Sequence, residues 1–157
     1  MTTILVSKRE MAMAADRQCT SDDGYKNIYQ PKITRIVHET TGPMLFATSG
    51  KINQTAKFEH WFREALDTPG KKHNEAEIKD MRAIVFKPDG TLLLYEGSLT
   101  PFELQDEIFG IGSGSHFGIG AMLHGADLKE AIRIASLCDV YTGLGIQYES
   151  FKHISSR

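Results

Sequence analysis

Short apolar stretches separated by polar turns dominate the N-terminal part of the chain. Residues 3–16 hold two such stretches, TILVS and MAMAAD, around a charged turn, which is typical of a β-hairpin. The segments KITRIVH and MLFATSG predict two more strands around the loop ETTGP, whereas residues 19–31 are polar and rich in turn formers. The chain is therefore expected to begin with four strands before any helix.

A helical pattern follows over residues 53–66. Its apolar residues Phe58, Trp61, Phe62 and Leu66 recur at helical spacing, which predicts an amphipathic helix. The next segment, DTPGKKHNEAEIKD, is charged and predicts a surface loop with one helical turn over residues 75–79. MRAIVFKPDGTLLLYEG then predicts a hairpin, because PDG supplies turn chemistry between two apolar strands.

Helices dominate the C-terminal part of the chain. Residues 98–107 are interpreted as a linker, and IFGIGSGS predicts a strand that runs into a glycine-rich bend. Two helices are predicted, around residues 117–123 and over 127–139, and GIQYESFKHI predicts a last strand. Asp127 is suited to cap the second helix, for which the predicted apolar stripe is Leu128, Ile132, Ala135 and Leu137.

This order of strands, helix, strands, helices and strand favours an α+β fold in which sheets pack together and helices lie outside. The length of 157 residues fits a single domain. With 41% hydrophobic and 24% charged residues, the composition is that of a globular protein with a sizeable core.

Composition also narrows the expected partners. The net charge is -2 and no run of Lys or Arg exceeds two, so nucleic acid is not an expected partner. No 18-residue apolar segment occurs, so no membrane association is expected. Cys19 and Cys138 lie far apart without a metal-ligand spacing, which favours a reducing, cytoplasmic setting and predicts neither metal nor cofactor.

Five residues are candidates for a catalytic role, and each also has an ordinary structural interpretation. Thr2 follows an initiator methionine, where small residues are common, and Asp16 could be a turn residue. Lys32 could be solvated, Ser113 could belong to a simple glycine bend, and Asp139 could merely end a helix. The glycines of GIGSGS do not have the spacing of a nucleotide-binding loop.

Taken in chain order, several short motifs resemble those of the proteasome β-subunit family, which includes the bacterial HslV-type peptidase. TTILVSK after Met1 and AADRQCT are similar to the first hairpin of the family. KITRI is similar to the strand that carries the family's catalytic lysine, and ATSG to the turn that forms its oxyanion hole. IGSGS and DVYTG resemble two further motifs, so the matches cover nearly the whole chain in the family's order.

The resemblance implies a four-layer αββα sandwich of the N-terminal-nucleophile hydrolase type, with one domain over residues 1–157. One helical layer is expected to be shortened, because DTPGKKHNEAEIKD is too short and polar for the family's second helix. The resemblance further implies a threonine endopeptidase. Removal of Met1 would expose Thr2 as the nucleophile and its α-amino group, with a pKa of about 7.7–8, as the base.

Roles for other residues also follow from the resemblance. Lys32 would lower the proton affinity of the Thr2 hydroxyl and amine, and Asp16 would hold that lysine. The Gly50 N–H would stabilise the oxyanion, with Ser49 as its nearest competitor and a further substrate-binding residue. The remaining assigned residues are Ser113 and Asp139, with Thr142 as a weaker third member, which orient the α-amino group, and Cys19 and Thr20, which line the bound peptide.

The expected partners are a peptide or unfolded protein as substrate, further copies of the chain in a homo-oligomeric ring, and an ATPase unfoldase as an optional partner. Two alternatives stay open. The chain could be a catalytically inactive ring or shell protein that keeps the fold, or an N-terminal-nucleophile amidase that acts on a small molecule.

Overall fold

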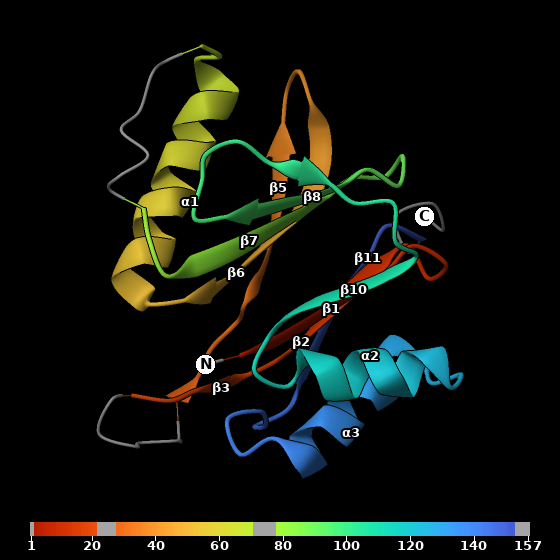
Figure 1. The fold of residues 1–157 in the computed structure, drawn as a ribbon. Helices are drawn as coiled ribbons and strands as arrows, with labels where there is room; N and C mark the ends of the chain where they lie inside the picture. The colour runs from red at the N-terminus through yellow and green to blue at the C-terminus, as the bar shows by residue number, and fades with distance from the viewer. Residues whose placement is uncertain (1, 22–27, 71–77, 153–157) are drawn as a thin grey trace.

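Two antiparallel sheets stack face to face, and helices cover both outer faces (Figure 1). The computed structural model describes residues 2–21, 28–70 and 78–152 of the chain. Within these ranges, no helix is long and apolar enough to cross a membrane.

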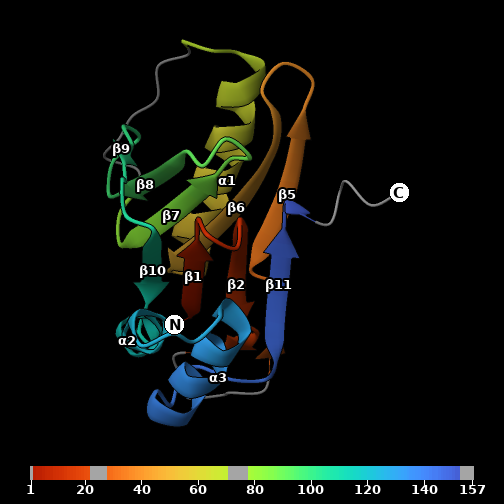
Figure 2. The same ribbon diagram turned by 90° about the vertical axis from the view of Figure 1, so that its right-hand side faces the viewer.

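The smaller sheet has four strands in the order β10-β1-β2-β11, which lie side by side in Figure 2. Thr3 at the start of β1 pairs with Gly112 at the end of β10, and Asp16 at the end of β2 pairs with Ile146. These pairings bring the polar residues Thr3 and Asp16 to the same end of this sheet. Its strands are β1 (Thr3–Ser7), β2 (Ala12–Asp16), β10 (Ile108–Gly112) and β11 (Ile146–Ser150).

The larger sheet has five strands in sequential order, and a separate pair of short strands connects the two sheets along the chain. The larger sheet consists of β5 (Ile33–His38), β6 (Gly42–Gly50), β7 (Met81–Phe86), β8 (Leu92–Glu96) and β9 (Phe102–Glu103). The short pair is β3 (Gln18–Cys19) with β4 (Ile28–Tyr29).

Three helices form the outer layers of the described part of the chain. Helix α1 (Ile52–Asp67) packs on the larger sheet, whereas α2 (Ser115–Leu123) and α3 (Leu128–Cys138) pack on the smaller one (Figure 1). This is the four-layer αββα sandwich that the motifs predicted. The α1 side carries a single helix among the described residues, in keeping with the predicted shortening of that layer.

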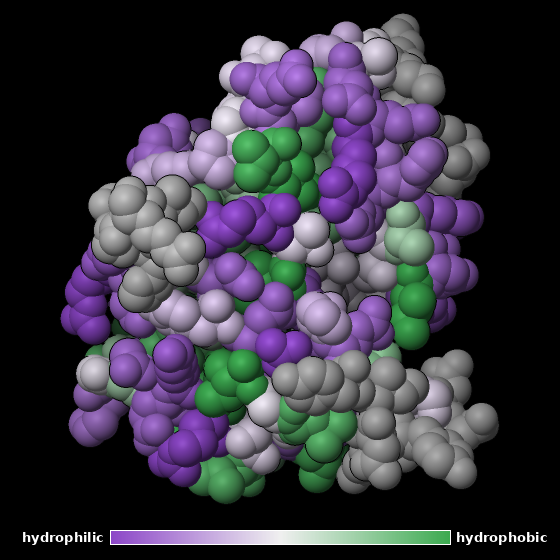
Figure 3. Space-filling model, turned by 180° about the vertical axis from the view of Figure 1, so that it is seen from behind, coloured by the Kyte–Doolittle hydropathy of each residue, from purple (hydrophilic) through white to green (hydrophobic). Residues whose placement is uncertain are grey.

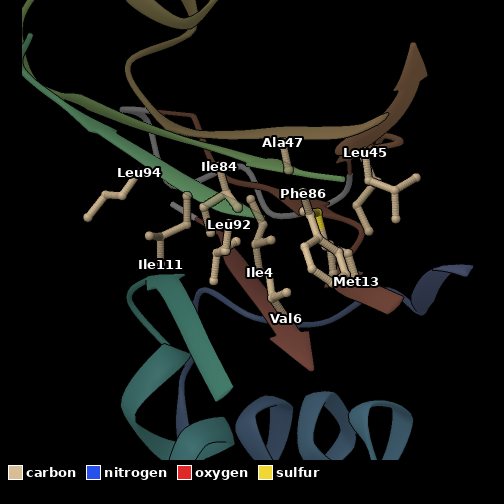
Figure 4. Close-up of a cluster of buried hydrophobic side chains, with 12 residues drawn as sticks. Ile4, Val6, Met13, Leu45, Ala47, Ile84, Phe86, Leu92, Leu94 and Ile111 are labelled. Atoms are coloured by element: carbon tan, nitrogen blue, oxygen red, sulfur yellow. The ribbon is translucent and has the colours of Figure 1, made fainter. Parts of the chain in front are cut away.

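The core follows from the two-residue periodicity of the strands. In β1, Ile4 and Val6 face the space between the sheets, while Leu5 points to the helices α2 and α3. In β6, Leu45 lies between the sheets, while Phe46 packs against α1. A strand that is buried on both faces has apolar residues at consecutive positions, and for this reason ILV in β1 and MLFA in β6 are continuous apolar runs. Figure 4 shows the side chains that fill the space between the sheets.

Most of the predicted elements are confirmed, and the hairpins and helices lie within a few residues of their predicted bounds. Two predictions were incomplete. The polar segment after Asp16 contains β3 and β4, so six strands precede α1 in place of the expected four, and the predicted linker at 98–107 contains β9. Each of these strands has only two residues, which is too short for an apolar pattern to reveal it. Most of the helical turn predicted at 75–79 lies outside the described residues.

The predicted apolar stripe of α3 was wrong at Leu137, whose exposed fraction is 73%. With about 100° of rotation per residue, a position nine residues after Leu128 lies on the opposite side of the helix. Ala131 takes the place in the buried stripe instead. The cap was predicted correctly, since Asp127 accepts a hydrogen bond from the Glu130 N–H over 2.8 Å.

Candidate active site

Asp16 is the centre of the buried polar network at the end of the smaller sheet. It is the last residue of β2 and its exposed fraction is 0%. A buried carboxylate is tolerated only where donors surround it. Its Oδ1 accepts hydrogen bonds from Thr2 Oγ1 (3.0 Å), the Thr3 N–H (2.9 Å) and Lys32 Nζ (2.6 Å), and its Oδ2 accepts from the Gln18 N–H (3.2 Å) and the Gly143 N–H (3.1 Å).

Lys32 provides a nearly buried cation in this network. It follows Pro31 and precedes β5, and its side chain is 10% exposed. Its Nζ donates to Asp16 Oδ1 and to the Gln18 carbonyl oxygen, each over 2.6 Å. Burial lowers the pKa of the Lys32 ammonium below its usual value, and the attraction to Asp16 offsets only part of that effect. The lysine is thus held in place by Asp16 and destabilised as a cation by its surroundings.

Ser113, Asp139 and Thr142 form a second polar cluster. Ser113 lies in the bend after β10, Asp139 ends α3, and Thr142 lies in the loop towards β11. Asp139 Oδ2 accepts hydrogen bonds from Ser113 Oγ and Thr142 Oγ1, each over 2.6 Å. Burial alone would raise the pKa of Asp139. The effects that lower it, led by the hydrogen bonds from these two hydroxyls and followed by that from the Tyr141 N–H, together outweigh burial and hold the pKa below its usual value.

Thr3 joins the two clusters, and sequence reasoning did not single it out. Its N–H donates to Asp16, while its Oγ1 lies 2.7 Å from Thr142 Oγ1 and accepts a hydrogen bond from the Gly114 N–H over 3.0 Å. Strand periodicity is the signal that could have identified it. Thr2 shares a face with Ile4, so the side chain of Thr3 must point to the opposite face, where the second cluster lies.

Two glycines of the IGSGS bend are required by close contacts with the N-terminal strand. Gly112 has a φ of +98°, and a Cβ on it would collide with the carbonyl oxygen of Thr2. A Cβ on Gly114 would collide with Thr3 Oγ1. The bend therefore packs closely against Thr2 and Thr3. This close packing accounts for the glycines, and a bound nucleotide is not needed to explain them.

Gly50 belongs to the wall of an open pocket of about 420 Å³ next to this network. It ends β6 with a φ of +134°, and a Cβ on it would collide with the Asp80 carbonyl oxygen. Ser49 and Gly112 line the same pocket, and Gly112 is packed against Thr2. Gly50 and Ser49 thus lie on the same side of the molecule as Thr2, at the opening between the two sheets.

Cys19 and Thr20 lie on the other flank of the network. Cys19 is half-buried in β3, where it pairs with Ile28 of β4. Thr20 follows β3, and its Oγ1 accepts a hydrogen bond from Gln18 Nε2 over 3.3 Å. Their contact with a peptide stays a prediction. In the described ranges, His, Cys, Asp and Glu side chains form no cluster of three or more that could hold a metal ion.

No protein-family profile matches the sequence, and no curated protein matches it significantly. Solved structures do match. HslV from Trypanosoma brucei is 20% identical, with a TM-score of 0.72 over 94% of this chain and 98% of that chain. BPH from Thiobacillus denitrificans, in complex with epoxomicin, is 18% identical, with a TM-score of 0.68 over 94% and 97%.

The Gly-1 mutant of Anbu from Hyphomicrobium sp. strain MC1 is 12% identical, with a TM-score of 0.72 over 94% of this chain and 80% of that chain. These neighbours are proteasome-type N-terminal-nucleophile hydrolases. At such low identities the likeness establishes the fold. The fold that the motifs predicted is therefore confirmed by structural comparison.

Proposed function

We propose that this chain is a threonine peptidase in which Thr2 is the nucleophile once Met1 has been removed. The observation that carries the proposal is the shared oxygen Asp16 Oδ1, which accepts hydrogen bonds from Thr2 Oγ1 over 3.0 Å and from Lys32 Nζ over 2.6 Å. A threonine hydroxyl beside a nearly buried ammonium is an unusual and costly arrangement for a purely structural role.

Removal of Met1 turns the amide nitrogen of Thr2 into a free amine. An amine with a pKa of about 7.7–8 is a suitable general base near neutral pH. It would take the proton of Oγ1 as that oxygen attacks the substrate carbonyl, and would later give the proton to the departing amine. Water would then hydrolyse the ester on Thr2 and restore the hydroxyl.

The surrounding residues support these steps through charge and position. The Lys32 ammonium would repel a proton on the nearby amine and hydroxyl, which favours the nucleophilic form. Ser113 and Asp139, with Thr142, would fix the direction of the α-amino group. The Gly50 N–H, or that of Ser49, would donate to the oxyanion, and each such donor is worth about 2.7–4 kcal/mol in other hydrolases.

The proposed substrate is a peptide or an unfolded protein, bound in extended form beside Cys19 and Thr20. A short strand flanking a reactive centre is suited to main-chain pairing with such a substrate. Cys19 and Cys138 are free thiols, in keeping with a cytoplasmic location. An ATPase unfoldase would be needed only for folded substrates.

Further copies of the chain are also proposed as partners, because apolar side chains cluster on the surface around the end of α3. Figure 3 shows several hydrophobic patches on one face, some of them at the end of the molecule that α2 and α3 occupy. Exposed apolar residues that follow one another closely favour a contact between copies. They are Leu137, Val140, Leu144 and Ile146, with exposed fractions of 73%, 65%, 41% and 38%.

Reaction with epoxomicin, the compound bound to BPH in its structure, tests the proposal directly. A peptide epoxyketone reacts with a hydroxyl and an amine together, so mass mapping should place the adduct on Thr2 of a chain that lacks Met1. Thr2→Ala should abolish both the adduct and peptide hydrolysis, and Thr2→Ser should retain both. Thr41→Ala, an exposed threonine in the β5–β6 turn, is the matched control.

The other outcomes of this experiment decide between the alternatives. Retained Met1 with no adduct would contradict the proposal and favour an inactive ring or shell protein. An adduct on Thr2 without hydrolysis of any peptide, in a monomer or dimer, would favour an amidase that acts on a small molecule.

A further inference from the structure

The pocket beside Gly50 lies on one particular flank of Thr2. In the smaller sheet, β1 has β2 on one side and β10 on the other (Figure 2). Cys19 and Thr20 continue from β2, whereas the pocket wall includes Gly112 at the end of β10. With respect to Thr2, the pocket and the β3 flank are therefore on opposite sides.

The larger sheet shows the same division. Lys32, which contacts the Gln18 carbonyl oxygen, precedes the edge strand β5. The pocket residues lie on the strands that follow in the sheet, with Gly50 on β6, Arg82 on β7 and Glu96 on β8. Both sheets thus place Thr2 between the β3 flank and the pocket, and Gly50 is part of the pocket wall.

We infer that this pocket receives the side chain of the residue immediately after the scissile bond, the first residue of the leaving fragment, and that it favours a basic side chain there. The inference rests on the proposed function. If the acyl part of the substrate lies beside β3 and its carbonyl lies at Thr2 and Gly50, an extended chain continues towards the opposite flank. The pocket lies on this opposite flank, in the path of the extended substrate chain.

The chemistry of the pocket wall decides which side chain fits. Arg82 Nε donates to Glu96 Oε1 over 2.8 Å across β7 and β8, and Asp80 Oδ2 pairs with Lys51 over 3.2 Å. The lining residues thus include two carboxylates and one guanidinium, whereas Lys51 is not among them. Each of these ion pairs involves one oxygen of its carboxylate, and the carboxylate has a second oxygen as well. These ion pairs are largely exposed and therefore exchange partners at little cost. A lysine or arginine fits this wall better than a large apolar residue.

Internally quenched peptides that differ only in the residue after the scissile bond provide the test. Wild-type protein without Met1 should give a higher kcat/KM for Lys than for Leu or Asp at this position. Asp80→Asn combined with Glu96→Gln should reduce the Lys-to-Leu ratio by about threefold to tenfold, the range expected for two exposed ion pairs. Glu59→Gln, which removes a carboxylate of an exposed ion pair on α1, should leave the ratio unchanged.

Epoxomicin labelling of the same proteins separates the two proposals, because the peptide part of an epoxyketone occupies the acyl side alone. Normal labelling of Thr2 in the double variant together with a reduced ratio supports the inference. Normal labelling with an unchanged ratio overturns the inference and leaves the proposed function in place. Failure to label Thr2 in the wild-type protein overturns both.

Discussion

Lys32 and Asp16 form a nearly buried ion pair, with Nζ and Oδ1 separated by 2.6 Å and side chains that are 10% and 0% exposed. Neither residue has a stable place in this interior without the other, because a buried charge without a partner costs several kcal/mol. The pair also fixes the position of Thr2, whose hydroxyl donates to the same oxygen. Stability and the proposed chemistry therefore depend on the same contact.

Substitution of Asp16 by Asn should destabilise the fold as well as abolish labelling of Thr2. The expected loss in free energy of unfolding is about 3–5 kcal/mol, because the Lys32 ammonium would be left in the interior without its counter-charge. Urea denaturation measures it. The double variant Asp16→Asn with Lys32→Met should recover part of the stability but no labelling. A double variant less stable than Asp16→Asn would contradict this explanation.

Thr3→Val should uncouple the two polar clusters while preserving the shape of the side chain. Loss of the hydroxyl leaves the buried Gly114 N–H without its acceptor, so the expected destabilisation is about 1–3 kcal/mol. The rate of epoxomicin labelling should fall as well, because Thr142 would lose its contact with the N-terminal strand. The comparable Thr68→Val, at the exposed end of α1, should change stability by no more than about 0.5 kcal/mol.

Asp139 should make stability depend on pH in the acid range. Its pKa in the folded protein lies below the ordinary value of 3.8, so its ionised form stabilises the fold above that value. This contribution is lost as the pH falls through the folded-state pKa. The stability difference between wild type and Asp139→Asn should therefore be constant near neutral pH and shrink below pH 3.8.

Ser113→Ala gives a second measurement on the same carboxyl. Removal of one of its hydroxyl donors should raise the pKa of Asp139 towards its usual value, as followed by a carbon NMR titration. An unchanged pKa in this variant would mean that Ser113 does not stabilise the carboxylate.

Gly112→Ala should disrupt the site, whereas Gly120→Ala should not. A methyl group at Gly112 would collide with the Thr2 carbonyl oxygen at a backbone φ of +98°, so we expect destabilisation of about 1–3 kcal/mol or more and loss of labelling. Gly120 lies in α2 with open space around it, and alanine there should stabilise the fold by about 0.5–1 kcal/mol. Thermal unfolding and adduct formation measure both variants.

The apolar surface around the end of α3 should govern assembly. Leu137→Glu combined with Val140→Glu should lower the particle mass measured by light scattering after size exclusion, because charges would enter the proposed contact between copies. Val37→Glu introduces a charge at an equally exposed position on β5 and should leave the mass unchanged. A mass that responds only to Val37→Glu would place the contact elsewhere.

Periodicity and turn chemistry determined most of the fold from the sequence. TILVS and AMAA are strands because every position of them is apolar or small, and α1 is a helix because Phe58 and Phe62 recur on one face. These are local signals, set by which side chains a strand or helix can bury. Leu137 shows their limit, since its apolar character alone gave no information about the direction in which it points.

The sequence also identified Thr2, Asp16, Lys32, Ser113 and Asp139 as candidates, through motifs in a characteristic order. Only the tertiary structure decided how they meet. The shared oxygen of Asp16, the bridge through Thr3 and the pocket between Gly50 and Gly112 depend on contacts between residues far apart in the chain. The registers of β1 with β10 and of β2 with β11 bring Thr3 and Asp16 to one end of the smaller sheet, and the stacking of the two sheets adds Lys32 and Gly50. No local pattern of residues specifies either arrangement.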